Sequence, residues 1–402
     1  MALSPTCDLF VLTGEPSGDA YGGAIVAALK RTQPDLVVAA MGGPALAGAG
    51  AEIEQDIEGM AVMGLGPVLA RLPSLMKTMD RVTAAISARR PRAILSIDYP
   101  GMNFRLLHRL RGLRRQGTRF LHVVAPQVWA WRPRRAKGYA QAIDRLFCFF
   151  PFEPPLFSRH GCRAEFVGHP LLDLVPDRTD TAGIDAELGI PAERPLLLLA
   201  PGSREREVAT LLPIYHQAAE HFQRLEGRRI AIAVSRVPDI PIQRYRDATH
   251  FPLVEGHYRE LCARAHVALV ASGTATLEAA LLGAPHVIAY RTDRLTAMLA
   301  RRVLIAPHVG LPNLVADGRI VPEVLQDQLT PVRLVAHLRR LWSGPARARM
   351  LADLALVRQR LGGGGAVQRI ADAVADEILS GRRRATFGSG FYSEDDDRPR
   401  RS

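Results

Sequence analysis

Short apolar runs alternate with amphipathic stretches along the first part of the chain. Asp19–Lys30 has the pattern of a helix and follows a turn of glycine, proline and serine at Gly14–Gly18. The apolar runs that predict strands are Asp8–Thr13, Leu36–Met41, Ala93–Ile97 and Phe120–Val124. Strands that alternate with helices form βαβ units, so the pattern predicts a parallel sheet covered by helices.

The same alternation restarts in the second half of the chain. Its apolar runs are Pro195–Ala200, Arg229–Val234, His266–Val270 and Pro285–Tyr290. Two successive halves of this kind predict an α/β fold with two doubly wound, Rossmann-like domains. We place the N-terminal domain at 1–172 and the C-terminal domain at 173–361, with the boundary in the proline- and aspartate-containing stretch Leu172–Glu193.

The C-terminal part has a different pattern. Four consecutive glycines, Gly362–Gly365, predict a flexible hinge. Apolar residues at helical spacing then predict a helix over Val367–Leu379, so 362–380 form a hinge and a C-terminal helix. Residues 381–402 carry blocks of like charge and few apolar residues, which predicts a disordered tail.

Composition excludes several classes of protein. Apolar residues make up 48% and charged residues 23%, as in ordinary globular proteins. No run approaches the roughly 18 apolar residues of a transmembrane helix, and no basic segment precedes the first apolar run as in a secretory signal. We therefore expect a cytoplasmic protein. The four cysteines have no zinc-type spacing, and we predict neither a metal site nor a cofactor.

Positive charge is concentrated in one window. The net charge is +12, and between Arg89 and Arg145 there are 14 basic residues but two acidic ones. Such a window indicates an anionic partner, either a lipid surface, a phosphate group or a nucleic acid, unless it is simply a solvated arginine-rich face. No sequence signature of a nucleic-acid-binding fold is present, so nucleic acid is not the predicted partner.

Three strand-to-helix junctions carry candidate binding residues. They are Gly14–Asp19, Pro201–Arg204 and Ala271–Glu278. Free backbone N–H groups at a helix start suit an anion or a sugar hydroxyl, although a plain turn would have the same residues. In the second junction Ser203 is positioned to cap the next helix and Arg204 to grip a phosphate. With Glu278 as an acceptor for ribose hydroxyls, the pattern favours a nucleoside diphosphate.

Asp98 directly follows the predicted strand Ala93–Ile97. Ligands of open α/β sheets gather at the carboxyl ends of strands, where this carboxylate could act as a general base toward a hydroxyl. The alternative is a turn or helix-capping aspartate.

Two further segments suit a lipid surface. Apolar residues between 60 and 79 recur at helical spacing, with Pro67 and Pro73 dividing them into two short helices. This stripe either packs in the core or meets acyl chains. The segment Val128–Arg135 interleaves two tryptophans with arginines, a mixture found at lipid interfaces and in base-stacking sites.

In combination, these blocks resemble the bacterial lipid-A-disaccharide synthase family. The resemblance covers roughly Leu9 to Gln328. The matching blocks are GEPSGD at 14–19, GGPAL at 42–46, MAVMGL at 60–65, PQVWAWRPRRAK at 126–137, PFEPPLF at 151–157, FVGHPLLD at 166–173, PGSREREV at 201–208, ASGTATLEAALLGAP at 271–285 and LPNLVADGRIVPEVLQD at 311–327.

The resemblance implies a glycosyltransferase of the two-domain B-type fold, whose last helix crosses back to the first domain. The family transfers a 2,3-diacylglucosamine unit from its UDP derivative onto 2,3-diacylglucosamine 1-phosphate, which gives a β-1,6-linked disaccharide 1-phosphate and UDP in lipid A biosynthesis. It acts peripherally at the cytoplasmic face of the inner membrane and needs no metal for catalysis. The glycine hinge leaves open a homodimer that exchanges C-terminal segments.

We hypothesise a direct inverting displacement in which Asp98 is the base and Arg204 stabilises the leaving UDP. The UDP-sugar would be bound by Gly202, Ser203, Ser272, Gly273, Thr274, Glu278 and Asn313. The acceptor would be bound by Glu15, Ser17, Gly18, Asp19, Trp129 and Arg132. The acyl or membrane face would be formed by Val68, Leu69, Leu72, Leu75 and Met76.

One position departs from the family pattern. Many members have the motif IDxPDFN, whereas this chain has Gly101 in place of the second aspartate. If that second acid were the base, the chain would be impaired. Gly101 leaves open the alternative of a non-catalytic lipid-binding relic. A separate alternative is a related B-type transferase that uses another UDP-sugar and lipid acceptor.

Overall fold

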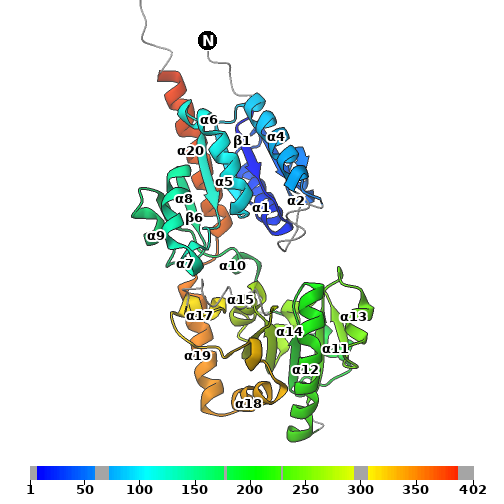
Figure 1. Cartoon of the computed structure of the whole chain (residues 1–402). Coiled ribbons are helices and arrows are strands. Elements are labelled where there is room, and N and C mark those ends of the chain that lie inside the picture. Colours follow the sequence, from blue (N-terminus) through cyan, green and yellow to red (C-terminus); the bar gives the residue numbers. More distant parts are fainter. Residues whose placement is uncertain (1–6, 59–71, 176–178, 228–229, 294–306, 388–402) are drawn as a thin grey trace, which may run out of the picture.

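The structure is a computed structural model that describes residues 7–58, 72–175, 179–227, 230–293 and 307–387. Two parallel β-sheets, each flanked by helices, follow one another along the chain (Figure 1). The predicted α/β fold with two Rossmann-like domains is confirmed.

The N-terminal sheet has, in the described ranges, seven parallel strands in the order β3-β2-β1-β4-β5-β6-β7. The strands are β1 Leu9–Leu12, β2 Val38–Gly42, β3 Glu52–Asp56, β4 Ala93–Ile97, β5 Arg119–Val123, β6 Arg145–Cys148 and β7 Arg163–Phe166. One face packs against α1 (Pro16–Thr32) and α20 (Ala366–Phe387), and the other against α4 (Leu72–Arg89), α5 (Pro100–Arg109), α8 (Ala136–Ala142) and α9 (Pro154–Ser158).

The C-terminal sheet has six parallel strands in the part of the chain that is described, in the order β10-β9-β8-β11-β12-β13. The strands are β8 Leu196–Ala200, β9 Ala231–Arg236, β10 Leu253–Glu255, β11 Val267–Ala271, β12 His286–Tyr290 and β13 Glu323–Leu325. Its larger core cluster includes residues of α12 (Glu205–Glu226), α18 (Pro331–Trp342) and α19 (Pro345–Arg360). Its smaller cluster includes residues of α11 (Ala182–Leu188) and α14 (Tyr258–Arg264).

The remaining elements are short. They are α2 Pro44–Gly48, α6 Arg111–Arg115, α7 Val128–Trp131, η1 Pro133–Arg135, α10 Leu171–Leu174, α13 Ile242–Arg246, α15 Thr274–Leu281, α17 Leu311–Ala316 and η2 Gln326–Gln328. In the ranges that the structure describes, no helix combines the length and the apolar character needed to cross a bilayer.

The strands found from the sequence are buried on both faces, although β6, which is also buried, was missed. In β8, Leu197 and Leu199 point into one core cluster while Leu196 and Leu198 point into the other. Each fully buried leucine contributes roughly 1.5–3 kcal/mol relative to an exposed one, so a continuous apolar run is stable only in the middle of such a sheet.

Five strands were not predicted: β3, β6, β7, β10 and β13. Four of these, β3, β7, β10 and β13, lie at sheet edges, where one side of the strand has no neighbour among the described strands and the sequence is partly charged. The last helix also differs from the prediction, because α20 continues to Phe387 through residues that we expected to be disordered. Residues 388–402 lie outside the described ranges.

Helix α20 returns to the N-terminal sheet, as expected for a B-type fold (Figure 1). Its apolar stripe, which includes Ile370, Val374 and Ile378, joins the core cluster formed by α1 and the strands β1, β4 and β5. The C-terminal helix therefore completes the N-terminal domain of its own chain.

The four glycines before α20 are held by side chains of two segments. Asp173 accepts hydrogen bonds from the backbone N–H groups of Gly365 and Val367, the first turn of α20. Arg369 donates to the carbonyl oxygens of Val167, Gly363 and Gly364 at 2.8–3.1 Å. The glycine segment predicted as a flexible hinge is thus fastened in a turn by residues from the FVGHPLLD block and from α20.

We expect Asp173→Ala to weaken this attachment by about 0.5–2 kcal/mol, the usual cost of losing a helix N-terminal cap. Hydrogen exchange of the α20 backbone amides would then speed up selectively. The matched control is Asp372→Ala, which removes an exposed carboxylate on α20 that pairs with Gln368. Equal protection of α20 in both variants would contradict a capping role for Asp173.

Candidate functional site

Loops with the predicted residues leave the carboxyl ends of four strands. The loop after β1 carries Glu15 and the one after β4 carries Asp98, whereas Arg204 follows β8 and Glu278 follows β11. Because the strands of each sheet are parallel, both loops of a sheet lie at the same edge, the edge where α/β proteins bind ligands.

Charged groups of the two domains act on each other at these edges. Burial raises the pKa of Glu15, and the charge of Asp98 raises it further while the Arg204 guanidinium lowers it. Burial, with smaller contributions from Glu278 and Asp98, raises the pKa of Tyr21 to about 12. Glu15 of the N-terminal domain therefore lies within electrostatic reach of Arg204 of the C-terminal domain, and Tyr21 within reach of Glu278. Asp98 acts on both Glu15 and Tyr21 from within the N-terminal domain.

Asp98 sits on a strained turn. Asp98 and Tyr99 both have a φ of 46°, in the left-handed region that costs most residues about 1–3 kcal/mol. The buried amide of Asn103 stabilises the turn by donating to the carbonyl oxygens of Asp98 at 2.7 Å and Ile97 at 3.2 Å. Burial raises the pKa of the Asp98 carboxyl, and the Tyr99 backbone N–H lowers it. Asn103 is a positioning residue that the sequence pattern did not reveal.

Gly14 makes room for this turn. A Cβ atom built on Gly14 would overlap the Tyr99 ring, so only glycine lets the aromatic ring lie against the loop after β1. The loop with Glu15 and the loop with Asp98 are packed together in this way. This close approach explains the first glycine of the GEPSGD block.

Gly101 lies exposed in the first turn of α5. A Cβ atom added to it would have no atom within 4 Å beyond its chain neighbours and the backbone of its own helix. A carboxylate here would face solvent at a helix N-terminus, which is electrostatically favourable. The absence of the second acid is therefore not enforced by packing among the described residues.

We expect Gly101→Asp to fold normally and to gain about 0.3–1 kcal/mol from the helix dipole. The rate of sugar transfer should change by less than about ten-fold, because Asp98 already provides a base at the strand end. Thermal unfolding and a transfer assay of both proteins would check this. A rate increase of a hundred-fold or more would mean that the missing acid, and not Asp98, is the base.

The loop after β8 is organised by Glu207, which the sequence pattern did not single out. Its carboxylate accepts from the backbone N–H of Ser203 at 3.1 Å and of Arg204 at 3.3 Å, and contacts the Arg204 guanidinium at 3.2 Å. Gly202 has a φ of 114°, and a Cβ there would strike Glu207. The helix cap was predicted wrongly, since Arg204 and not Ser203 occupies the capping position. The Arg204 side chain remains 56% exposed.

The loop after β11 presents its residues at the start of α15. Gly273 has a φ of 145° and, like Thr274, is exposed, whereas Ser272 is half-buried. Glu278 lies one turn into the helix and pairs with Arg259 at 3.4 Å. Arg259 also donates to the Leu174 carbonyl oxygen at 3.1 Å, so the segment between the domains helps to orient Glu278.

Asn313 is fully buried and its amide is used within its own loop. The Nδ2 group donates to the Val321 carbonyl oxygen and to Glu323, both at 2.8 Å, and Oδ1 accepts from the backbone N–H groups of Ile320 and Val321. Glu323 also accepts from the Gly310 N–H at 2.9 Å. In this structure Asn313 orders the LPN loop and has no hydrogen-bonding capacity left for a ligand.

The residues of the first junction differ in accessibility. Ser17 is exposed, Glu15 is half-buried and Gly18 is buried. Asp19 is also buried, and it accepts from the backbone N–H groups of Gly43, Ala45 and Leu46 at 2.7, 2.8 and 3.3 Å. Asp19 therefore fastens the GGPAL loop to α1, which the sequence pattern did not reveal.

Trp129 is held by a buried carboxyl group. Its indole Nε1 donates to Glu153 at 3.3 Å, and its ring lies edge-on to Phe152. Burial raises the pKa of Glu153 to about 8, although the backbone N–H of Phe150 and the Trp129 indole lower it. Arg132, in the next turn, is exposed.

The predicted acyl or membrane face is described only in part. Val68 and Leu69 lie outside the described residues, as does the side chain of Leu72. Leu75 is half-buried against the core, and Met76 is 43% exposed on α4.

Fewer basic side chains of the window Arg89–Arg145 can bind an anionic partner than its net charge suggested. At least six of its basic side chains form ion pairs with other described residues: Arg89, Arg92, Arg109, Arg114, Arg119 and Arg145. Arg105, Arg134 and Lys137 are exposed on α5, η1 and α8, which cover the same face of the sheet as α4.

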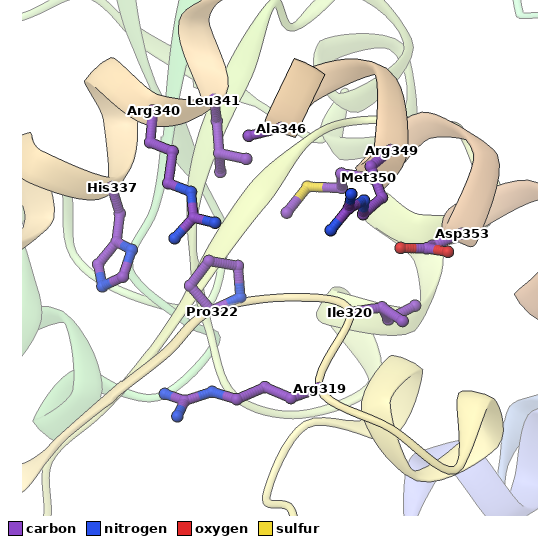
Figure 2. Close-up of a pocket in the computed structure, with 10 residues that line it drawn as sticks. All are labelled: Arg319, Ile320, Pro322, His337, Arg340, Leu341, Ala346, Arg349, Met350 and Asp353. Atoms are coloured by element: carbon purple, nitrogen blue, oxygen red, sulfur yellow. The ribbon is translucent and has the colours of Figure 1, made fainter. Parts of the chain in front are cut away.

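A cavity of about 390 Å³ lies elsewhere in the C-terminal domain (Figure 2). Arg319 and Pro322 come from the loop that enters β13, Arg340 from α18 and Arg349 from α19. Since this loop meets β13 at its amino end, the cavity is at the opposite edge of the sheet from Arg204 and Glu278.

Two α/β domains with charged loops at facing strand ends define the architecture shared by B-type glycosyltransferases and UDP-sugar epimerases. Solved structures agree: a UDP-GlcNAc 2-epimerase of Neisseria meningitidis bound to UDP-GlcNAc has a TM-score of 0.61 at 13% identity, covering 92% of this chain and 99% of that one. A calicheamicin glycosyltransferase has a TM-score of 0.58 at 14% identity, covering 94% and 99%.

The chain belongs to the lipid-A-disaccharide synthetase family, whose model matches residues 9–361. A lipid-A-disaccharide synthase of Myxococcus xanthus is 36% identical over 382 residues, covering 93% of this chain and 98% of that protein. The chain is thus a glycosyltransferase, as the sequence resemblance predicted.

Proposed function

We propose that the protein joins UDP-2,3-diacylglucosamine to 2,3-diacylglucosamine 1-phosphate, which gives the β-1,6-linked lipid A disaccharide 1-phosphate and UDP. The observation that carries the proposal is the position of Glu15, which lies within electrostatic reach both of Asp98 in its own domain and of Arg204 in the other domain, in a member of this family. A base and a phosphate-binding cation on opposing domains are the two groups that an inverting transfer needs.

In the proposed reaction, Asp98 accepts the proton of the acceptor 6-hydroxyl as its oxygen attacks the anomeric carbon. The bond from that carbon to the UDP oxygen breaks, and UDP leaves with the electron pair from the opposite side. The raised pKa of Asp98 makes it a stronger base than an exposed aspartate. The strained turn held by Asn103 fixes its direction.

The donor UDP would lie against the starts of α12 and α15. Arg204, pre-oriented by Glu207, contacts the diphosphate together with backbone N–H groups near Gly202 and Ser203. Ser272, Gly273 and Thr274 surround the other end of the diphosphate or its ribose. Glu278, held by Arg259, accepts hydrogen bonds from the ribose hydroxyls.

On the acceptor side, Glu15, Ser17 and Gly18 would contact the sugar, while Trp129 and Arg132 would meet its acyl-bearing or phosphate end. Asp19 takes part through the GGPAL loop that it orders, and on the donor side Asn313 takes part through the LPN loop, because both side chains are already hydrogen-bonded within the protein.

The testing experiment is a turnover assay with both substrates in detergent, in the presence of EDTA, with products identified by mass spectrometry. We expect the disaccharide 1-phosphate and UDP in equal amounts. UDP-N-acetylglucosamine added in excess should compete weakly and should not be transferred. Transfer of that sugar instead would favour the related B-type transferase, and binding without any product would favour the relic.

We further propose that the protein acts at the cytoplasmic face of the inner membrane, bound peripherally. The face of the N-terminal domain formed by α4, α5, α8 and the adjoining η1 combines the exposed Met76 with the exposed cations Arg105, Arg134 and Lys137. Partial insertion of an apolar group together with attraction to anionic headgroups is a common mode of reversible membrane binding.

We expect the triple variant Arg105→Glu, Arg134→Glu, Lys137→Glu to lose at least about ten-fold in binding to vesicles with anionic lipid, since each cation near such a surface contributes about 1 kcal/mol. Sedimentation with phosphatidylglycerol vesicles would measure this. The control reverses three exposed arginines of the C-terminal domain, Arg224, Arg333 and Arg340. An equal loss of vesicle binding in the control would mean that binding depends on the net charge of the protein and not on this face.

A further inference from the structure

Three potential metal ligands converge on the C-terminal domain, away from the substrate loops. His216 and Glu220 lie four residues apart on α12, and His250 lies in the loop that leads into β10. Their donor atoms are all within 4.8 Å of one another. His216 follows the first residue of α12 by eleven positions, about 16 Å along the helix from the Arg204 loop at 1.5 Å per residue.

We propose that these three side chains bind a divalent transition-metal ion of the zinc type. Two imidazoles and one carboxylate are a donor set that suits Zn²⁺, and residues four apart on a helix point to the same side. Donor atoms around a tetrahedral zinc lie about 3.4 Å apart, given bonds of roughly 2.1 Å. The exposed His250 therefore needs to move by about 1 Å.

A second layer already orients the His216 ring. Its Nδ1 atom lies 3.0 Å from the hydroxyl of Thr249, which also accepts the backbone N–H of Phe251 at 3.2 Å. Thr249 is buried, so this contact is fixed by the fold. With Nδ1–H donating to Thr249, the lone pair of Nε2 points toward Glu220 at 3.6 Å. Metal-binding histidines are typically oriented in this way through their other nitrogen.

The surroundings leave room for an ion and a water ligand. An open depression of about 780 Å³ is lined by residues that include His216, His250 and Thr249, together with the oppositely charged Arg246 and Asp247. The negative charge of the Glu220 carboxylate neutralises one of the two positive charges of the metal ion. The remaining coordination position faces this depression and is available to solvent.

The ion would join the edge of the C-terminal sheet to its longest covering helix. β10 is a three-residue edge strand paired only with β9 among the described strands, and His250 lies just before it. A metal bridge between His250 and α12 would hold this edge in place. The expected role is therefore stabilisation of the C-terminal domain and not participation in sugar transfer.

Zinc binding to the full chain tests the proposal, after treatment with EDTA and removal of the chelator. Calorimetry and elemental analysis should give one zinc per chain for the wild type. His250→Ala and Glu220→Gln should each weaken binding by at least about ten-fold, since each removes a ligand. The matched control, His221→Ala, removes the neighbouring imidazole on α12 and should bind as the wild type does.

The structural role has a separate readout. Zinc should slow hydrogen exchange in residues 249–255 of the wild type, and it should have no such effect in His250→Ala, which removes an exposed side chain. Absence of stoichiometric zinc binding by the wild type, or unchanged affinity in both ligand variants, would overturn the proposal. Neither readout depends on the transfer reaction, so the outcome is independent of the proposed function.

Discussion

Replacing Asp98 with asparagine is expected to lower kcat for disaccharide formation by about 10²–10⁴-fold, the usual contribution of a general base. The amide has nearly the same shape, so the strained turn and its hydrogen bonds from Asn103 should persist. Binding of UDP should be unchanged. Steady-state kinetics with both substrates would measure the effect, with Asp35→Asn, an exposed carboxylate on another loop, as the control.

The pH dependence provides a second check of the same role. Asp98 acts only when it is deprotonated, and burial raises its pKa. The rate should therefore fall as the pH decreases through this raised pKa, at a higher pH than for an ordinary aspartate. Asp98→Asn should abolish that acidic limb. If Asp98→Asn retained both the rate and the acidic limb, Asp98 would not be the general base.

The second large effect is expected for Arg204→Gln. The guanidinium is 56% exposed and pre-oriented by Glu207, so it is free to bind the diphosphate and to stabilise the charge that develops as UDP leaves. Loss of one such group typically lowers kcat by about 10²–10³-fold. Affinity for UDP should fall as well.

Arg206→Gln is the matched control for this experiment. Arg206 is an exposed arginine two residues further along α12, and its removal changes the net charge by the same amount. Kinetics and UDP titrations should separate the two variants. If Arg206→Gln were as defective as Arg204→Gln, the effect would come from the general electrostatic field and not from a direct contact.

Most core strands could be predicted from the sequence because burial on both faces favours a continuous apolar run; the exception is β6, which begins with the charged Arg145. β4 was predicted with its observed bounds, Ala93–Ile97. The edge strand β3 could not, since its sequence Glu-Ile-Glu-Gln-Asp has one apolar residue and its stability comes from pairing with β2. Pairing of that kind depends on the partner strand and leaves no periodic signal.

The positions of the candidate site residues could be predicted because strand ends fix them. The partners that orient these residues could not be predicted from the sequence. Glu207, Asn103 and Arg259 each act through a contact that depends on the folded loop. Conversely, Asp19 and Asn313 have polar side chains that suit a ligand, but backbone N–H groups already occupy them, from the distant GGPAL loop for Asp19 and from its own loop for Asn313.

The candidate metal cluster shows the same limit. His216 and Glu220 have a recognisable spacing on one helix, yet two ligands do not define a site. The third, His250, is brought to them by the connection between α13 and β10. Nothing in the local sequence around His250 indicates that it lies next to His216 and Glu220, so we predicted no metal site from the sequence alone.

The return of α20 has a consequence for biosynthesis. A ribosome makes the strands of the N-terminal sheet first, but the helix that covers one of their faces is made more than 300 residues after β1, at residues 366–387. Until then, the apolar surface that receives Ile370, Val374 and Ile378 is without its cover. The nascent N-terminal domain is therefore expected to need chaperone protection, and its folding to finish after that of the C-terminal domain.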